Sequence, residues 1–320
     1  MKNLWVFLLC IGLMFGIGFG SGPAEGKDSG PEKTSKGDIS LKTFKVMSYN
    51  IRLIAPADKE NEWKYRKEAL VSEIRATDPL LLGVQEATWP QMEFLAKELS
   101  DYAWIGAGRD DGKQKGEFSA VFYKKAFLKI LDSGTFWLSE SPEKAGSLGW
   151  DAACRRVVSW GKFEFANGKK SMKEYRDLQG KKFVYANTHF DHIGKIARKN
   201  SALLIVEQLD KLSENLPVAV SGDFNARSDS EVYSLLVEKK ANDRGWRDTF
   251  AVAKKKDLQH QGTFHNYGKL PEKERPRIDY IFINKGFGAD LFRICGDQRN
   301  GRFTSDHVPI TAEIYFADAP

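Results

Sequence analysis

The segment LPVAVSGDFNAR, residues 216–227, constrains the fold more than any other part of the chain. Its apolar run at 218–220 is short and mostly β-branched, which is typical of a strand buried inside a sheet. After a Ser-Gly pair, Asp223 and Asn225 follow at alternate positions. Because residues two apart point to the same side of an extended chain, we expect a carboxylate and a carboxamide together at the carboxyl end of this strand. Sheets of α/β proteins bind their ligands at such ends, although the two side chains could instead cap an ordinary turn.

Polar side chains follow other apolar segments of the chain in the same way. Strands are predicted at 44–49, 80–84, 118–123, 155–160, 183–188, 277–283 and 310–316, a strand, turn and strand at 127–137, and helices at 62–76, 89–99, 193–212 and 230–238. The polar residues at or beside the predicted strands are Asn50, Glu86, His189, Asp279, Asp306 and His307. Ordinary strand ends carry turn-forming residues, so a repeated supply of carboxylates, amides and imidazoles indicates a functional site.

The residue types in this set favour acid–base chemistry assisted by a metal ion. Carboxylate and amide oxygens are hard ligands that suit a small divalent cation such as Mg²⁺. Histidines beside acids can stabilise phosphoryl oxygens, orient a water molecule or protonate a leaving group. A structural zinc site would need clustered thiolates, whereas Cys154 and Cys295 lie far apart in sequence. The sequence lacks a G-x-S-x-G elbow and a P-loop, which argues against the two hydrolase classes that use them.

Six short motifs, taken in order, resemble the endonuclease/exonuclease/phosphatase superfamily. They are SYNIR (48–52), GVQEA (83–87), NTHFDH (187–192), SGDFNA (221–226), RIDYIF (277–282) and TSDHVPI (304–310). The resemblance covers nearly the whole chain after residue 41. It implies one α/β (α+β) domain at 41–320: a four-layer sandwich of two packed, mostly antiparallel mixed sheets flanked by helices.

The resemblance also implies roles for the residues that match these motifs. Glu86 resembles the principal metal ligand of the family, with Asn50 and Asp306 beside it. Asp223 resembles the residue that orients or deprotonates the attacking water, and Asn225 the residue that positions that water and the phosphate. The implied cofactor is Mg²⁺, with Mn²⁺ as a substitute.

Two histidines and an arginine complete the implied site. His307 resembles the imidazole that grips the phosphate, and Asp279 the carboxylate that orients its ring, so we predict a hydrogen bond between them. His189 resembles a second catalytic and phosphate-binding histidine, with Glu117 as its supporting partner. Arg156 is the candidate phosphate-binding arginine, although the neighbouring Arg155 leaves the register open.

Other polar residues have simpler interpretations. We expect His260 and His265 to be surface or loop groups, because no matched motif surrounds them. The polar stretch at 166–180 is expected to form a hairpin tip or a surface insertion. Cys154 and Cys295 could form one disulfide or remain as two free thiols.

The function implied by the resemblance is metal-dependent hydrolysis of a phosphodiester by in-line attack of an activated water. The net charge of +6 and the basic residues Lys254–Lys256, Arg275 and Arg277 are compatible with a nucleic acid substrate. Alternatives on the same fold are a phosphomonoesterase, a sphingomyelinase-like phospholipid hydrolase and a non-catalytic phosphate-binding module. We expect the mature chain to be a monomer without stable membrane insertion.

The first residues predict export from the cytoplasm. Leu4–Phe19 is apolar or glycine throughout and follows a single lysine, which is typical of a signal peptide at residues 1–24. A polar stretch at 25–40 predicts a disordered linker. The expected location is periplasmic or extracellular, and the alternative is a retained N-terminal membrane anchor.

Overall fold

The computed structural model describes residues 42–237 and 246–317, apart from the side chains of 170–172. The predicted signal peptide and linker lie outside the described residues. Among the helices that are described, none is long and apolar enough to cross a bilayer.

The larger sheet has seven strands in the order β10-β12-β15-β1-β2-β4-β3. Its strands are β1 (Phe44–Asn50), β2 (Leu81–Ala87), β3 (Tyr102–Ile105), β4 (Phe118–Lys124), β10 (Lys255–Leu258), β12 (Phe287–Ile294) and β15 (Ile310–Phe316). The pairs β1–β2 and β10–β12 are parallel, and the other pairs are antiparallel.

The second sheet has six strands in the order β5-β6-β7-β8-β11-β9. Its strands are β5 (Leu128–Trp137), β6 (Val157–Phe165), β7 (Lys182–His189), β8 (Val218–Asp223), β9 (Arg247–Asp248) and β11 (Asp279–Ile283). Only β7 and β8 pair in parallel. A small ribbon of β13 (Gln298–Arg299) and β14 (Arg302–Phe303) lies apart from both sheets.

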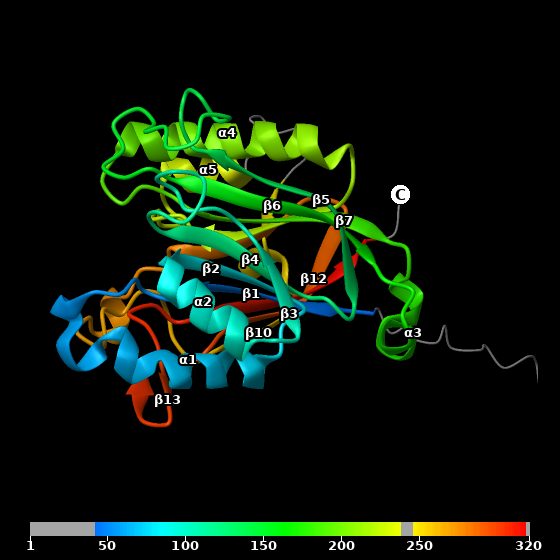
Figure 1. Ribbon diagram of the computed structural model, residues 1–320, viewed down its shortest axis with the longest axis horizontal. Coiled ribbons are helices and arrows are strands. Elements are labelled where there is room, and N and C mark those ends of the chain that lie inside the picture. The colour runs from blue at the N-terminus through cyan, green and yellow to red at the C-terminus, as the bar shows by residue number, and fades with distance from the viewer. Residues whose placement is uncertain (1–41, 238–245, 318–320) are drawn as a thin grey trace, which may run out of the picture. The chain divides into compact units, whose positions relative to one another are not determined.

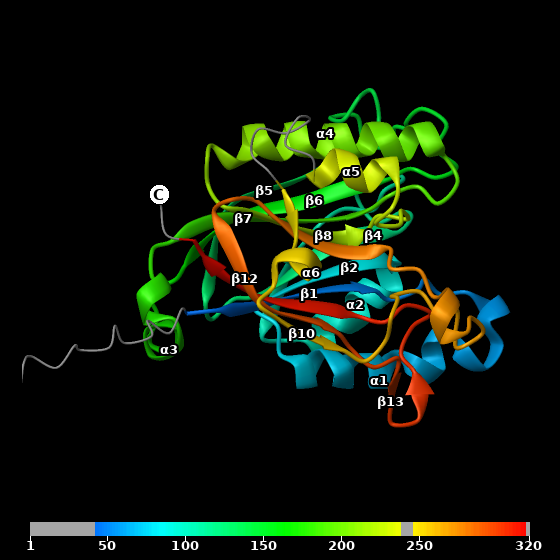
Figure 2. The same cartoon turned by 180° about the vertical axis from the view of Figure 1, so that it is seen from behind.

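The two sheets pack face to face between outer helical layers (Figures 1 and 2). Aromatic residues of both sheets, such as Phe44 and Phe183, form the core between them. Helices α1 (Trp63–Thr77) and α2 (Trp89–Glu98) cover the seven-stranded sheet through a second apolar cluster. Helices α4 (Lys195–Ser213) and α5 (Glu231–Val237) cover the six-stranded sheet through a third. The predicted four-layer sandwich with two mixed, mostly antiparallel sheets is therefore confirmed.

Local sequence signals set several helix ends. Thr88 and Gln91 form a capping box at the start of α2, which satisfies N–H groups that the first turn leaves free. Helix α1 ends at Thr77, and its C-cap Asp78 adopts a left-handed conformation with φ of 51° just before Pro79. Shorter elements are η1 (Pro56–Asn61), α3 (Lys169–Glu174), η2 (Arg176–Leu178), α6 (Thr249–Val252) and η3 (Glu272–Glu274).

The fold corrects some details of the sequence interpretation. Residues 128–137 form the single strand β5, with a register shift between Ile130 and Asp132, instead of two strands and a turn. The stretch at 166–180, predicted as a hairpin tip or a surface insertion, does connect the antiparallel strands β6 and β7, and it contains the helical elements α3 and η2. Strand β12 had no counterpart among the predicted elements.

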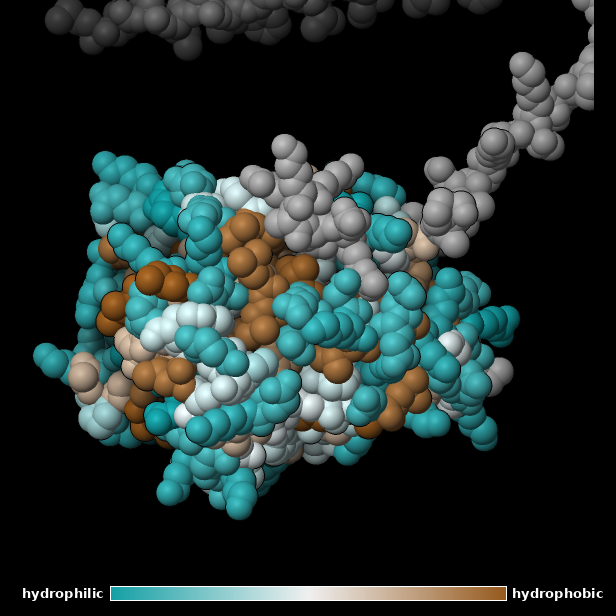
Figure 3. Space-filling model, turned by 90° about the horizontal axis from the view of Figure 1, so that it is seen from above, coloured by the Kyte–Doolittle hydropathy of each residue, from teal (hydrophilic) through white to brown (hydrophobic). Residues whose placement is uncertain are grey.

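Helix α4 buries a different face from the one its large apolar residues suggest. Ile196 is 57% exposed and Leu203 is 43% exposed, whereas Ala197, Ala202 and Ile205 are buried. Small side chains let the helix lie close to the sheet, so they occupy the inner face. The outer surface of this layer consequently mixes apolar residues with polar ones (Figure 3).

Candidate active site

Strand register brings the predicted residues of the six-stranded sheet together. In the parallel pair of β7 and β8, His189 lies opposite Asp223. In the antiparallel pair of β8 and β11, Asp223 lies opposite Asp279. Three polar residues thus stand side by side across adjacent strand ends, and two of them, His189 and Asp223, line a cleft of about 340 Å³.

A second group of side chains, which we call the acidic wall, consists of Asn50, Glu86, Asp223 and Asp306. The amide of Asn50 donates to Glu86 Oε1 and to Asp223 Oδ2, both at 3.0 Å, and so links the two sheets. Glu86 lies at a register shift in β2 with a φ of 64°, which turns its carboxylate toward the cleft. Its other oxygen accepts from the backbone N–H of Leu53 at 3.2 Å.

A buried arginine of α1 holds the acidic wall in place. Arg66 is 1% exposed and donates to the carbonyl oxygens of Ile51 at 2.6 Å and Thr304 at 3.0 Å. These carbonyls flank Asn50 and Asp306, which are about 250 residues apart in sequence. Ser305 adds a 2.7 Å hydrogen bond to the carbonyl of Asn50. Arg66 was not among the predicted site residues, although its spacing from the apolar Trp63 and Leu70 places it on the buried face of α1.

Polar contacts beneath the cleft fix the distance between the two sheets. Asn187 of β7 donates to the carbonyls of Val84 at 2.8 Å and Ala120 at 3.0 Å in the other sheet. Its side-chain oxygen accepts from Gln85 at 2.7 Å and from a serine hydroxyl of β8 at 2.9 Å. Gly83 permits this approach, because a Cβ there would lie 2.2 Å from Ser221 Oγ. Asn187 is a positioning residue that the sequence analysis did not single out.

The predicted hydrogen bond between His307 and Asp279 is present, with Nδ1 and Oδ2 2.9 Å apart. Burial alone would lower the pKa of His307, but the charge and hydrogen bond of Asp279 raise it to about 10. The imidazolium Nε2 lies 3.7 Å from Asp223 Oδ2. Burial, together with the charge of Asp279, raises the pKa of Asp223 to about 7.

His189 and Asn225 meet on the other side of Asp223. Asn225 Nδ2 donates to the carbonyl of Phe190 at 3.0 Å and to His189 Nε2 at 3.0 Å. Burial and the nearby charges of Arg156 and Arg109 hold the pKa of His189 well below its usual range, so the ring is neutral. With Nε2 accepting a hydrogen bond, the ring proton is on Nδ1.

A third group, which we call the guanidinium wall, consists of Arg109, Glu117 and Arg156. Glu117 forms a 2.7 Å ion pair with Arg109. The predicted pairing of Glu117 with His189 is not formed, and His189 Nδ1 has no hydrogen-bond partner within the described chain. Burial raises the pKa of Glu117, while Arg109 opposes this effect. The sequence analysis missed Arg109, which lies in a loop without strand or helix periodicity.

The two adjacent arginines have different surroundings. Arg156 lines the cleft with a side chain only 6% exposed. Arg155 is 44% exposed and donates to the carbonyl of Gly146 at 2.6 Å, away from the cleft. The structure therefore places Arg156, and not Arg155, at the cleft.

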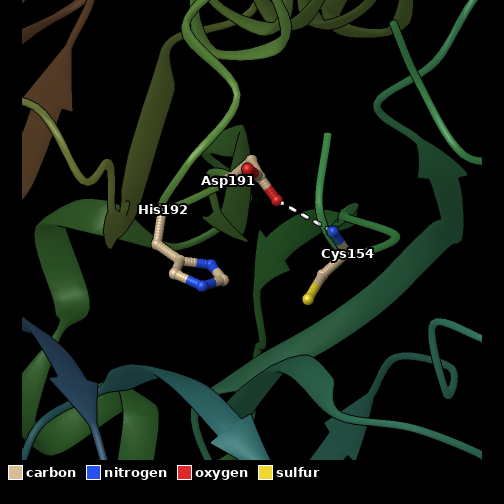
Figure 4. Close-up of side chains that lie close together, drawn as sticks. All are labelled: Cys154, Asp191 and His192. Carbon is tan, nitrogen blue, oxygen red and sulfur yellow. Dashed lines mark hydrogen bonds between the residues drawn. The ribbon is translucent and has the colours of Figure 1, made fainter. Parts of the chain in front are cut away.

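Cys154, Asp191 and His192 gather at the edge of the cleft (Figure 4). Their possible ligand atoms lie within 4.8 Å of one another. However, Asp191 already accepts backbone N–H groups of Cys154 at 3.0 Å, Ile193 at 2.9 Å and Gly194 at 2.6 Å. Asp191 thus organises the start of the α4 segment, and the positive Arg156 beside it disfavours a cation. Cys154 and Cys295 are free thiols.

The acidic wall contains the oxygen ligands predicted for a metal ion. Glu86 and Asp306 each lie 3.8 Å from the guanidinium of Arg52, which a bidentate contact with Asp58 holds in place. Burial raises the pKa of Asp306, and the charge of Glu86 adds to this effect. A crowded pair of carboxylates that already attracts a cationic group fits a hard divalent cation. Beside them, Asp223, Asp279 and His307 form a close group of metal-ligand types, but His307 is hydrogen-bonded to Asp279.

Eight of the ten predicted site residues line the cleft, and Asn50 and Asp279 lie directly behind it. The basic residues expected to contact nucleic acid do not line it. Arg275 pairs with Glu272 at 2.8 Å, and Arg277 pairs with Asp248 at 2.8 Å. His265, expected at the surface or in a loop, is in a loop but fully buried.

The fold and the cleft define an α/β sandwich with a polar site of carboxylates, amides and imidazoles at its strand ends. The chain matches the model of the Endonuclease/Exonuclease/phosphatase family over residues 47–307, and it belongs to that family. Members of this family are hydrolases that act on phosphoester bonds.

Solved structures of similar proteins agree with this assignment. An endonuclease/exonuclease/phosphatase from Bacteroides vulgatus is 33% identical, with a TM-score of 0.78 over 86% of this chain and 99% of that one. A mannosyl-6-phosphatase from Bacteroides thetaiotaomicron is 33% identical, with a TM-score of 0.76 over 85% of this chain and all of that one. The human Nocturnin catalytic domain, at 20% identity and a TM-score of 0.64, shares the fold, with 86% of this chain and 94% of that chain covered.

Curated relatives are more distant and longer. Protein angel of Drosophila melanogaster is 26% identical over 234 residues, which are 68% of this chain and 59% of that protein. A protein of Acanthamoeba polyphaga mimivirus is 21% identical over 263 residues, which are 73% of this chain and 37% of that protein. The chain therefore spans less than two thirds of either curated relative.

Proposed function

We propose that this chain is a divalent-metal-dependent phosphoester hydrolase in which a water molecule attacks phosphorus in line with the leaving oxygen. The position of Asp223 carries the proposal. Its Oδ2 lies 3.0 Å from Asn50 Nδ2 and 3.5 Å from His189 Nε2. A buried carboxylate among such polar groups is suited to hold a water molecule and accept its proton. Its pKa of about 7 matches a base that works near neutral pH.

The remaining polar groups are assigned to the phosphate. The imidazolium of His307, oriented by Asp279, attracts the phosphoryl oxygens. Asn225, His189 and Arg156 border the same space and are assigned to phosphate binding. As water adds to phosphorus, its proton passes to Asp223, the bond from phosphorus to the leaving oxygen breaks, and that oxygen takes a proton from solvent.

Glu86, Asn50 and Asp306 are the residues that would hold the metal ion. Mg²⁺ bound there would neutralise phosphoryl charge, and Mn²⁺ is the expected substitute. Arg52, which Asp58 holds at 3.0 Å, lies 3.8 Å from Glu86 and from Asp306 and so helps to keep these two carboxylates together. A non-catalytic phosphate-binding module would not need a buried base beside oriented histidines, which makes that alternative the weaker one.

Two substrate classes have specific support. A phosphodiester, including a nucleic acid, is favoured by a second groove that shares Asn225 with the cleft. Its charged lining is more basic than acidic, with Lys195, Arg198, Lys199 and Arg227 against Asp229 and Glu231. A phosphomonoester is favoured by the 33% identity to a mannosyl-6-phosphatase. The sphingomyelinase-like alternative has no comparable support from the cleft.

A hydrolysis panel tests the proposed function. The purified chain is incubated with an aryl phosphodiester, an aryl phosphomonoester, mannose 6-phosphate, plasmid DNA, RNA and sphingomyelin, each with Mg²⁺, Mn²⁺ or a chelator. We expect release of phosphate or nucleotide with either metal and none with the chelator. Inactivity on every substrate, or activity that the chelator leaves unchanged, would contradict the proposal.

We also propose that the protein is exported, on the basis of the apolar segment Leu4–Phe19. The mature chain is expected to begin between Ser21 and Glu25. N-terminal sequencing of the protein from its native host decides this point. A chain that retains Met1, or one lipidated at Cys10, would exclude it.

A further inference from the structure

The guanidinium wall contains more hydrogen-bond donors than acceptors. Among the described residues, Arg109 Nε and Arg156 Nε and Nη1 are buried without a hydrogen-bond partner, and so is His189 Nδ1. Nearly all buried polar groups in folded proteins have partners, so several unpaired donors in one place require an explanation. All three residues border the same cleft. Such a set is complementary to a ligand that only accepts hydrogen bonds, namely an oxyanion.

Neighbouring contacts hold these donors in fixed positions. The indole Nε1 of Trp137 donates to the carbonyl of Arg109 at 2.7 Å, and the backbone N–H of Arg109 donates to the carbonyl of Glu117 at 3.1 Å. Arg156 Nη2 donates to His192 Nδ1 at 3.1 Å. Because the arginine can only donate, His192 Nδ1 is the acceptor of this bond, and His192 Nε2 is the ring nitrogen left to donate at the cleft.

The two arginines of the wall differ in how closely a carboxylate approaches them. Glu117 is the only carboxylate that forms a hydrogen bond with either arginine among the described residues. Asp191 lies 3.7 Å from Arg156, but its oxygens are already bonded to three backbone N–H groups. Burial, together with the charge of Arg109, lowers the pKa of Arg156. In the part of the chain that the structure describes, two carboxylates therefore lie beside the two guanidinium groups, but only Glu117 is bonded to one of them, and Arg156 keeps N–H groups without a carboxylate acceptor.

We propose that Arg109 and Arg156 together bind the terminal phosphoryl group of a phosphomonoester dianion, and that Arg109 determines the preference for monoesters over diesters. This inference rests on the proposed function and selects between its two substrate classes. A monoester offers three terminal oxygens and two negative charges, whereas a diester offers two oxygens and one charge. Two guanidinium forks match the first better than the second. A diester would also need room for a second substituent beside two largely buried arginines.

The competing explanation is that Arg109 only neutralises Glu117. Arg109→Gln alone cannot separate the two explanations, because it leaves Glu117 buried and unpaired. The double variant Arg109→Gln/Glu117→Gln removes both charges with side chains of similar size. If Arg109 binds the substrate, the double variant stays impaired; if it only neutralises Glu117, the double variant recovers.

The activity test compares 4-nitrophenyl phosphate with bis(4-nitrophenyl) phosphate, which have the same leaving group. With Mg²⁺ at pH 7.5, we expect the native chain to have a kcat/KM about tenfold or more higher for the monoester. In Arg109→Gln and in the double variant, kcat/KM for the monoester should fall about 10–100-fold, while that for the diester changes less than about threefold. Arg75→Gln is the matched control, because Arg75 is exposed on α1, and within the described part of the chain its side chain bonds only to Glu98. A native preference for the diester, or recovery in the double variant, would overturn the inference.

A binding test gives a result even if no substrate is hydrolysed. Inorganic phosphate is titrated into the native chain, the single variant, the double variant and Arg75→Gln by isothermal calorimetry. We expect the double variant to bind phosphate about 10–100-fold more weakly than the native chain. Unchanged affinity would overturn the inference whatever the activity. Arg109-dependent phosphate binding without any turnover would instead contradict only the proposed function.

Discussion

The two walls of the cleft differ in how their polar groups are satisfied. In the acidic wall, Asn50 joins Glu86 to Asp223 through two 3.0 Å hydrogen bonds, and Arg66 fixes the flanking backbone. In the guanidinium wall, Arg109 and Arg156 keep buried N–H groups without partners in the described structure. Hydrogen bonds within the acidic wall fix its geometry without a ligand. In the guanidinium wall, an anion would supply the hydrogen-bond acceptors that the unpaired N–H groups lack. We infer that the acidic wall supports the chemical step and that the guanidinium wall supports binding.

Energetics favours this division. A buried donor without a partner costs about 1–3 kcal/mol of folding free energy, so the guanidinium wall destabilises the free chain. An anion that completes these hydrogen bonds would recover part of that free energy and stabilise the fold. In the acidic wall, no buried side-chain atom of the four residues lacks a hydrogen-bond partner. A bound cation would reduce the repulsion between its carboxylates.

The largest expected effect separates chemistry from binding. Asp223→Asn keeps the shape of the side chain but removes the proposed proton acceptor, so kcat should fall by about 10³–10⁴. Phosphate should bind as tightly as before or more tightly, because a negative charge beside the ligand is gone. Steady-state kinetics and phosphate titration check both parts. A variant that keeps kcat but loses phosphate affinity would reverse the assignment of Asp223.

The second prediction concerns the pair at the end of β11. His307→Ala should lower kcat/KM by about 10²–10³, and Asp279→Asn by a similar factor, because the carboxylate orients and charges the ring. Residues that act as one unit are non-additive, so the double variant should be hardly worse than either single variant. Circular dichroism shows whether all three variants remain folded. Losses that multiply in the double variant would mean that the two side chains work independently.

The third prediction tests whether the acidic wall binds the metal. Glu86→Gln should raise the Mg²⁺ concentration needed for half-maximal activity by about 10–100-fold, because one charged ligand becomes neutral. Glu68→Gln is a suitable control, since Glu68 is 69% exposed on α1. Full turnover of Glu86→Gln at low Mg²⁺ would place the metal elsewhere, with the Asp223 and Asp279 group as the next candidate.

The fourth prediction concerns the stability of the fold and not activity. Burial is the main cause that lowers the pKa of His265 from 6.5 to about 4. Between these values the unfolded chain binds the proton more readily, so the contribution of neutral His265 is fully present above pH 6.5 and is lost as the pH falls toward 4. Its upper limit is about 3 kcal/mol.

Denaturant unfolding at pH 7 and pH 4.5 tests this prediction with the native chain and His265→Gln. The native chain should lose more unfolding free energy between the two pH values than the variant does. Equal losses would show that His265 does not control this pH range. The result also shows how much of any loss of activity at low pH is due to unfolding and not to protonation of the two walls.

Local sequence patterns predicted the acidic wall better than the guanidinium wall. Asp223 and Asn225 follow a buried strand directly, so strand periodicity alone places them at a sheet edge. Arg109 lies in a loop, and its contact with Glu117 depends on how that loop closes. The sequence motifs led us to expect that Glu117 would pair with His189, whereas it pairs with Arg109. The order of motifs along the chain does not determine which side chains are in contact.

Tertiary packing also explains why the role of Arg66 and the buried face of α4 were not predicted. Arg66 reaches a carbonyl at Thr304, a contact that spans 238 positions of sequence. The inner face of α4 is set by small residues such as Ala197 and Ala202, while the larger Ile196 stays exposed. The size of an apolar side chain therefore did not indicate which face the helix buries.

The central claim is that one wall performs chemistry and the other binds phosphate. Measuring both kcat and the phosphate dissociation constant for Asp223→Asn and for Arg109→Gln/Glu117→Gln, each with Mg²⁺, tests it most directly. The account predicts opposite results: the first variant loses about 10³–10⁴ in kcat and keeps its phosphate affinity, and the second loses about 10–100-fold in phosphate affinity. If both variants lose the same quantity to the same extent, the two walls do not have separate roles and the account is contradicted.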